Sequence, residues 1–513
     1  MYNIQAGLGE MKDLLKRAEK ARENWEMWRS IHQEAYDFAA PQRETFNLYS
    51  DGQRKNRHIF DSTAVDGLVT FSNRLQGSLI PSWVQWMNLI SGDEIPKEDI
   101  PRTNQALENQ TKIFFNAINH SNLSTEITPA FTDLGIGTGA IEIDEGDFSK
   151  GEILTFANVP LAELWPETPI RGKIENVWRQ QEIEAGHIKH TWRFADLPDK
   201  LDDKAKKNPH SKEKILNGML YNFKDSLYHQ VIIHKETKTL LFTQKFSSKR
   251  LIVFRWHVTP GETFGRGPIL QNMSDIRTCN KVKQFILENA AIQMAGMYTG
   301  VDDGVFNPHT VRIAPGTIIP VASNRSAEPS LQALPRAGDI GLGGIVLEDL
   351  QNSIKKALLA DPMGEISDPV RTATEQMIRM QEALKDRGAS FGRLKTELIE
   401  PLVAAVVDIL GSLGKMAKLR VDGKEVTIKH QSPLAKAESI EDFQNSQLWF
   451  SMLAQLPPEL VGGTVKVEEL PRYWAEKLDI PLDLVRDAAE RQQIAQVMME
   501  QAQQMQMDGR GTA

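Results

Sequence analysis

The chain has 513 residues, 41% hydrophobic and 25% charged, which is enough for two to four domains with sizeable cores. Its formal net charge of −8 excludes the overall positive field of a typical DNA-binding regulator. The single cysteine, Cys279, excludes an intrachain disulfide framework and a cysteine-based zinc site, and we expect it to be a packed thiol. We find no apolar run near about 18 residues and no signal peptide, so we expect neither membrane insertion nor secretion.

The first strong helix is predicted from about Met11 to Ala39, and Pro41 ends it. Its apolar residues recur at steps of three and four, which would suit either a coiled coil with a partner or packing against the chain's own domain. We favour the second alternative because several positions of the stripe are alanines, which allow close packing. The stripe comprises Met11, Leu14, Ala18, Ala21, Trp25, Trp28, His32, Ala35 and Ala39.

A second helix is predicted after the polar, basic loop Tyr49 to His58. Asp61 or Ser62 supplies its N-cap, and Pro81 closes it. Its apolar positions are Ala64, Leu68, Phe71, Leu75 and Leu79, and Trp83 and Trp86 follow.

Between Gly139 and His257 the apolar period changes to two, which predicts strands. Residues 140–144 and 153–156 predict a hairpin, and the charged stretch 196–214 predicts a loop or short helix. Further strands are expected at 177–192, 226–234, 239–246 and 251–256. Strands and helices together predict an α+β fold.

Pro268 suits the first turn of another long helix, with apolar positions from Ile269 to Met294. An irregular segment follows Gly296, with short strands expected at 311–313 and 317–321. The next helix carries Leu347, Leu350, Ile354 and Leu358 and is expected to end at Asp361-Pro362.

The stretch from Ser367 to Gly411 predicts a polar loop followed by an unusually long helix. Thr372 and Glu375 form a capping-box pattern at its start. Pro401 interrupts the helix, and Gly411 and Gly414 end it. Beyond Lys429, helices are expected at 443–456 and 482–499, followed by a frayed tail past Glu500.

This order of elements resembles the portal, or head-to-tail connector, protein of short-tailed bacteriophages. The resemblance rests on Asp61 to Leu89, Gly261 to Ala295, Ser367 to Gly411 and the "HQSPLAKAE" run at 430–438. It implies a wing or body at 1–265, stem helices at 266–298 and 340–361, and an α/β clip at 299–339. A tunnel loop would occupy 362–371, a long wing helix and return to the body 372–430, and a helical crown with a flexible tail 431–513.

The same resemblance implies a structural protein of the virion, without enzymatic activity, cofactor, metal or membrane contact. Its subunits would form a cyclic ring, expected to be a dodecamer, at one capsid vertex. The ring would nucleate head assembly with scaffold and major capsid protein in the host bacterial cytoplasm. It would dock the terminase large subunit, pass double-stranded DNA during packaging and ejection, and then receive a tail adaptor.

Basic residues near the stem and clip are the candidates to face DNA, since scattered phosphate contacts would guide any sequence without trapping it. They are Arg277, Lys281, Lys283, Arg312, Arg325, Arg336, Lys355, Lys356 and Arg371. Each could equally belong to a solvated or salt-bridging face. The tunnel loop consists of Pro362, Met363, Gly364, Glu365, Ile366, Ser367, Asp368 and Pro369. Its acidic residues Glu365 and Asp368, together with Asp361, argue against strong DNA binding by this loop.

Two alternatives remain at this point. The first is another ring-forming virion protein such as a tail adaptor, which would lack the helix-insertion-helix core. The second is an enzyme that binds S-adenosylmethionine, suggested by the glycine-rich run Asp133 to Gly139. Pro129 is expected to interrupt the segment before this run and an alternating strand follows it, so we expect these glycines to let a helix turn tightly into a hairpin. The sequence contains neither a P-loop nor a His-Glu-x-x-His motif. Ser353 and Lys356 fit a Ser-x-x-Lys spacing that is common by chance in helices.

Overall fold

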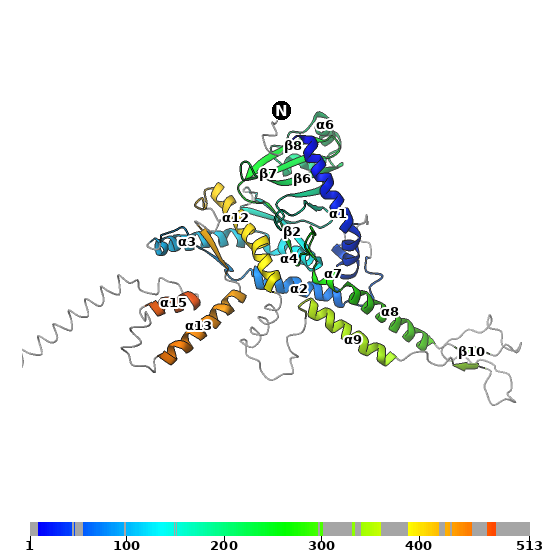
Figure 1. The fold of residues 1–513 in the computed structure, drawn as a ribbon. Helices are drawn as coiled ribbons and strands as arrows, with labels where there is room; N and C mark the ends of the chain where they lie inside the picture. The colour runs from blue at the N-terminus through cyan, green and yellow to red at the C-terminus, as the bar shows by residue number, and fades with distance from the viewer. Residues whose placement is uncertain are drawn as a thin grey trace, which may run out of the picture. The chain divides into compact units, whose positions relative to one another are not determined.

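The computed structural model describes residues 9–43, 46, 55–96, 99–147, 149, 151–295, 298–300, 331–333, 340–360, 388–419, 426–430, 433–453 and 469–478. The chain forms two compact units (Figure 1). The first comprises Met1–Gln76, Asn116–Pro362 and Ala389–Lys418, and the second Gly77–Phe115, Met363–Gly388 and Leu419–Ala513.

The N-terminal helix α1 spans Met11–Ala39, as predicted, and the 3-10 turn Pro41–Arg43 follows it. Most of its predicted stripe is buried, including Leu14, Ala18 and Trp25. The Trp25 Nε1–H donates to the Leu161 carbonyl oxygen at 2.9 Å. The stripe therefore packs against the chain's own first unit, which was the favoured alternative.

Two antiparallel sheets form the centre of the first unit (Figure 1). The smaller has the strand order β3-β2-β9 and contains the predicted hairpin. The larger is a meander in the order β4-β5-β6-β7-β8. Their bounds are β2 Thr138–Glu145, β3 Leu154–Asn158, β4 Leu164–Pro166, β5 Val177–Glu184, β6 Lys212–Asn222, β7 Leu227–His234, β8 Thr239–Phe246 and β9 Leu251–Arg255. Strands and helices within one unit confirm the α+β class.

The strand predicted at 177–192 is too long, and the structure corrects it. β5 ends at Glu184, and a 3-10 turn (Ala185–His187) and the short helix α5 (Ile188–Thr191) follow. Ile188 and Trp192 are spaced by one helical turn, and both enter the hydrophobic cluster beneath the larger sheet. The chain therefore coils here, because only a helical turn brings both side chains to the same side.

The charged stretch 196–214 contains the short helix α6 (Asp199–Lys207), as one of the two alternatives expected. The strand β6 that begins within it at Lys212 was not predicted, although it lies between β5 and β7. Pro129 was predicted to interrupt its segment, and this prediction is wrong. The helix α4 (Leu123–Ile136) instead runs through this proline. Ile127, Ala130, Phe131 and Leu134 are all buried, so tertiary packing stabilises the helix despite the missing N–H.

Four further helices lie wholly or mostly in the first unit. Helix α2 (Thr63–Leu79) begins where predicted, and α7 (Pro268–Gln271) precedes α8 (Met273–Ala295). The strands β10 (Tyr298–Gly300) and β11 (Leu331–Ala333) pair antiparallel, and α9 (Ile340–Ala357) follows. The predicted strands at 311–313 and 317–321 lie outside the described residues.

The long helix predicted after Thr372 is described only from Gly388 onward. It consists of α11 (Gly388–Leu394), a π-helical turn at Lys395–Ile399, and α12 (Glu400–Ser412). The π-helical turn ends two residues before Pro401, the residue of this helix that has no N–H to donate. Gly414, with φ of +67°, follows the end of α12.

The second unit contains the antiparallel strand pair β1 (Met87–Ser91) and β12 (Val426–His430), most of α3 (Ile100–Asn119), and the helices α13 (Pro433–Leu453) and α15 (Leu470–Leu478). The Trp86 ring packs edge-on against Phe114 and Phe115. Phe443 and Phe450 of α13 pack against Trp474 of α15. The predicted helix at 482–499 and the tail lie outside the described residues. No helix in the described ranges is long and apolar enough to cross a membrane.

Candidate functional site

The helices α8 and α9 lie side by side as an antiparallel pair, with β10 and β11 between them in sequence (Figure 1). One side of each helix is buried, at Ile276 and Cys279 in α8 and at Leu347 and Ile354 in α9. The opposite sides are exposed. We call these two helices the helix pair. They occupy the positions at which the sequence resemblance implied stem helices.

One end of the helix pair is fastened to the start of α2 by Asn280. The Asn280 Oδ1 accepts hydrogen bonds from the backbone N–H groups of Phe60, at 2.7 Å, and Asp61, at 3.1 Å. Its Nδ2 donates to the His58 carbonyl oxygen at 3.0 Å. A single amide side chain therefore satisfies three backbone groups before α2 begins.

Asp61 joins three helices through one carboxylate, and we call its contacts the Asp61 joint. Its Oδ1 accepts from the Thr63 N–H at the start of α2, at 3.0 Å, and its Oδ2 from Gln351 Nε2 of α9, at 2.6 Å. Cys279 of α8 also hydrogen-bonds to it. Burial alone would raise the pKa of Asp61, but these hydrogen bonds outweigh burial and hold the pKa below its usual value.

Cys279 is buried at the same joint, as expected for a packed thiol. Burial, with the nearby Asp61 charge, raises the pKa of the thiol to about 12. The group is therefore an unreactive thiol at neutral pH while the joint is closed. Further along α2, the Arg74 guanidinium makes a second link to this region, because it donates to the carbonyl oxygen of Leu359, just beyond α9.

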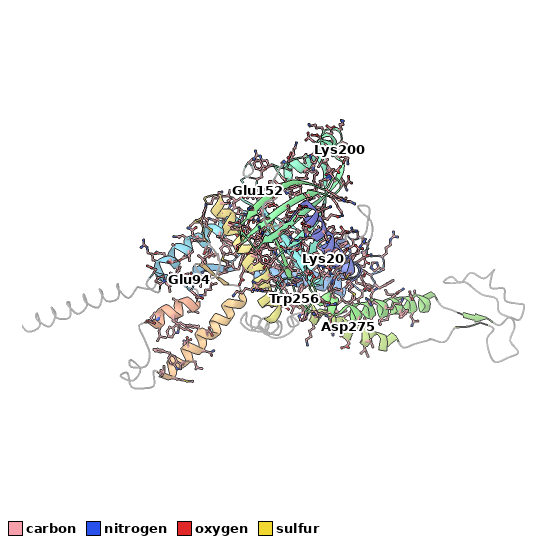
Figure 2. All side chains as sticks on the ribbon, turned by 45° about the horizontal axis from the view of Figure 1, so that its top comes forward. Lys20, Glu94, Glu152, Lys200, Trp256 and Asp275 are labelled. Carbon is pink, nitrogen blue, oxygen red and sulfur yellow. The ribbon has the colours of Figure 1, made fainter. Side chains whose placement is uncertain are left out.

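The predicted basic residues of α8 do not share one face. Arg277 is exposed and forms an ion pair with Glu34 of α1 at 2.5 Å. Lys281 is exposed on the same side and lies 4.7 Å from the centroid of the Phe285 ring. Lys283 is half-buried and turned toward Cys279, whose thiol its charge influences. Figure 2 labels Asp275, which lies in the first turn of this helix.

The other predicted DNA contacts are only partly described. Lys355 and Lys356 lie in the last turn of α9. Arg312, Arg325, Arg336, Arg371 and the predicted tunnel loop 362–369 lie outside the described residues. Acidic residues interrupt the positive charge, since Glu288, Glu348 and Asp349 are exposed on the same helices. The described part of the helix pair therefore carries charges of both signs.

The glycine-rich run Gly135 to Gly139 forms a backbone crossing and not a cofactor loop. A Cβ atom on Gly137 would lie 2.0 Å from the Gly265 carbonyl oxygen, and one on Gly267 would lie 2.2 Å from the Gly135 carbonyl oxygen. The Gly267 N–H donates to the Ile136 carbonyl oxygen at 2.7 Å. The chain's own backbone therefore covers this turn from α4 into β2, as expected for a tight turn into a hairpin.

The acidic residue of the same run is also used internally. Asp133 is buried and accepts hydrogen bonds from the Tyr36 hydroxyl, at 2.7 Å, and from Arg43 Nη2, at 2.7 Å. Burial raises the pKa of Asp133, and the Arg43 charge opposes the rise. Both the glycines and the carboxylate serve packing, which argues against the S-adenosylmethionine alternative.

One residue group within the described ranges could hold a metal ion by distance alone. Ligand atoms of Glu213, His234 and Glu236 lie within 4.8 Å of one another. Glu213 already accepts hydrogen bonds from Lys204, Ser211 and His234. These protein partners neutralise and saturate the carboxylate, so the group is a structural hydrogen-bond network.

The helical segment that begins at Gly388 with α11 is anchored to the smaller sheet by Arg255 of β9. This guanidinium is fully buried and contacts Glu397 of the π-helical turn, with Nη2 to Oε1 at 2.6 Å and Nε to Oε2 at 3.2 Å. The Arg255 backbone N–H also donates to Glu397, at 3.0 Å. The anchor therefore holds both the position and the rotation of this helix.

Four partners in the joint and the anchor were not predicted from the sequence, namely Asn280, Gln351, Arg255 and Glu397. For Asp61 a signal was present, since its capping role was predicted. For the others no local pattern exists, because each contacts a residue far away in the sequence.

Similarity to known proteins extends over nearly the whole chain. The sequence profile described as "Bacteriophage head to tail connecting protein" matches residues 11–485. A relative from Bordetella phage BPP-1, named "Probable portal protein", is 21% identical over 467 residues, which cover 84% of this chain and 80% of the relative. Since the match spans both units and includes the helix pair, the chain belongs to the family of bacteriophage head-to-tail connecting proteins.

Proposed function

We propose that the chain is the subunit of a portal ring, located at one vertex of a phage capsid. The observation that best supports this proposal is the family match over residues 11–485. Within it, α8 and α9 occupy the positions expected of a stem. The ring, expected to be a dodecamer, acts as a structural conduit and catalyses no reaction. It nucleates head assembly with scaffold and major capsid protein in the host cytoplasm.

Within this proposal, residues 1–265 are the wing or body, 266–298 and 340–361 the stem, and 299–339 the clip. The tunnel loop at 362–371 leads into the long helix at 372–430, and the crown occupies 431–513. The bounds of α8 and α9 support the stem assignment. The helix–strand pair–helix order from α8 to α9 also supports a portal subunit over a tail adaptor, which would lack it.

Double-stranded DNA passes through the ring during packaging and ejection. The described candidates on the helix pair are Arg277, Lys281, Lys283, Lys355 and Lys356, and the mixed charge favours passage over tight binding. The terminase large subunit docks during packaging, and a tail adaptor replaces it afterwards.

Negative-stain electron microscopy with native mass measurement on full-length protein tests the ring. Closed rings with an axial hole wide enough for duplex DNA would support the proposal and give the subunit number. A monomer that fails to assemble at any concentration, even with scaffold protein, would overturn it. Deletion of 362–369 in the phage tests the tunnel loop separately, because unchanged packaging and DNA retention would remove its assigned role.

A further inference from the structure

The helix pair exposes two faces of opposite character, both pointing away from the contact between α8 and α9. On α8, Lys281 and Phe285 lie one helical turn apart, and the Phe285 side chain is 56% exposed. On α9, Ile345 and Asp349 lie one turn apart, and Ile345 is 68% exposed. Each face therefore pairs one charge with one large apolar side chain, and the charges have opposite signs.

The four residues Lys281, Phe285, Ile345 and Asp349 lie at matching positions along the length of the helix pair. Ile286 lies next to Gly343, and a Cβ on that glycine would be 3.5 Å from Ile286 Cγ1. Further along, Cys279 and Gln351 both contact the Asp61 carboxylate, so they share a level too. In this antiparallel register Lys281 is level with Asp349, and Phe285 is level with Ile345.

The two faces do not meet within one chain. Leu347 and Ile354 turn toward α8 and are buried, whereas Ile345 and Asp349 turn away. Within the described residues the Asp349 carboxylate has no hydrogen-bond or ion-pair partner. Exposed apolar side chains next to a lone charge are typical of a surface that is covered on assembly.

We propose that the Lys281–Phe285 face of one subunit packs against the Ile345–Asp349 face of the next copy of this chain. Lys281 then forms an ion pair with Asp349, and Phe285 packs on Ile345. The proposal rests on the proposed ring function and gives that ring its stem contact. Rotation about the ring axis preserves height, so equal levels in one subunit stay equal between neighbours when the helix pair follows the axis.

Charge complementarity identifies a second copy of this chain as the partner that covers these faces. DNA carries only negative charge, so it would be repelled by Asp349 and would gain nothing from Phe285 or Ile345. A two-fold dimer through α8 would place Lys281 against Lys281, and one through α9 would place Asp349 against Asp349. Only a repeated α8-to-α9 contact pairs opposite charges, and such a heterologous contact generates a ring or a filament. Lys281 thereby becomes a subunit contact and ceases to be a candidate for the DNA surface.

Charge reversal in the full-length chain tests the ion pair. Lys281→Glu and Asp349→Lys should each raise the subunit concentration needed for half-maximal ring formation by about tenfold or more, because like charges then face each other. The double variant should recover most of the loss. If Lys281→Glu forms rings normally, or if Asp349→Lys does not rescue it, the proposal is wrong.

Disulfide trapping tests the apolar contact without altering charge. Phe285→Cys combined with Ile345→Cys should produce a ladder of oxidised multimers, while Cys279 remains buried. Leu287→Cys with Ile345→Cys is the matched control, since Leu287 is 48% exposed but lies on another side of α8. An equal ladder in the control, or no ladder from assembled rings, would contradict the contact. Wild-type protein that forms no rings would instead overturn the proposed function itself, so the two failures are distinguishable.

Discussion

The sheets of the first unit and its helix pair use charged residues in opposite ways. In the sheets, Glu142 is buried and contacts both Arg179, at 2.5 Å, and Asn217, at 2.7 Å. In the helix pair, Lys281 and Asp349 are exposed beside exposed apolar side chains. The sheet region therefore completes its interactions within one chain, whereas the helix pair exposes charged and large apolar side chains next to each other. Substitutions in the sheet region should affect folding, and those on the helix pair should affect assembly.

The largest expected effect is a loss of folding at the glycine crossing. In Gly137→Ala the new Cβ would lie 2.0 Å from the Gly265 carbonyl oxygen, so one backbone segment must move. We expect destabilisation of more than about 4 kcal/mol, measured from the midpoint of urea unfolding. Gly392→Ala is the control, since nothing lies within 4 Å of its Cβ and the helical site should gain about 0.5–1 kcal/mol. Similar midpoints for both variants would show that the crossing is not rigid.

The Arg255–Glu397 anchor should be nearly as sensitive. Arg255→Met removes the closer cation and leaves the Glu397 carboxylate, in a largely buried site, with only Arg393 at 3.5 Å. Loss of one member of such a pair costs about 3–5 kcal/mol, which thermal unfolding would detect. Arg277→Met is the matched control, because its ion pair with Glu34 is exposed and should contribute less than about 1 kcal/mol. Equal shifts would contradict the contrast between the two regions.

A pH dependence of folding, separate from the helix pair, should come from His32 of α1. Its ring is fully buried among aromatic side chains, neither ring nitrogen has a hydrogen-bond partner, and burial lowers its pKa from 6.5 to about 3. The unfolded chain therefore binds a proton that the folded chain rejects. Stability should fall by about 1.4 kcal/mol per pH unit between about pH 6.5 and 3 from this group.

His32→Leu should remove this acid sensitivity while leaving stability at pH 8 unchanged or slightly higher. The measurement is the urea midpoint as a function of pH for both proteins. His120→Leu, at an exposed surface position, is the matched control for the loss of a histidine. Parallel profiles for wild type and His32→Leu would refute the assignment.

The smallest effect on folding is expected at the Asp61 joint. Its lowered pKa means that its contribution is present above the usual aspartate range and is lost as the pH falls through the folded value. Asp61→Ala should cost about 1–2 kcal/mol near neutral pH and should accelerate thiol labelling of Cys279, whose burial the joint maintains. Asp66→Ala, on the exposed side of the same helix, should leave the labelling rate unchanged. Unchanged labelling in Asp61→Ala would show that the joint does not control access to the thiol.

Periodicity was sufficient to predict the elements whose burial pattern is set by their own sequence. α1, α2 and the strands β7, β8 and β9 all begin and end within a few residues of the expected bounds, whereas the long helix expected from Pro268 is divided at Asn272 into α7 and α8. β6 was missed because its pattern depends on a partner strand. Gly218 lies opposite Trp178, and the tryptophan ring fills the space above the glycine, 2.6 Å from where a Cβ would be. A glycine that looks like a strand breaker is therefore required there.

The two helices of the candidate site could be predicted from the sequence, but the side of each helix on which a given residue lies could not. Arg277 and Lys281 were placed on the correct helix, yet their side could not be known before the burial of Cys279 and Ile276 was seen. The Asp61–Gln351 hydrogen bond joins residues separated by 290 positions, and no local pattern encodes such a contact. The two helices of the pair are therefore encoded locally, whereas their attachment and their exposed faces depend on contacts between distant residues.

The glycine crossing also has a consequence for function assignment in other chains. Gly135, Gly137 and Gly139 have the spacing that motif searches associate with nucleotide cofactors, yet here two backbones approach closer than any Cβ allows. The same physical requirement, close approach to a backbone, produces both patterns. A search for such spacing will report a cofactor site wherever a helix turns into a strand beneath another loop. The discriminating observation is what approaches the glycines, a ligand or a second stretch of the same chain.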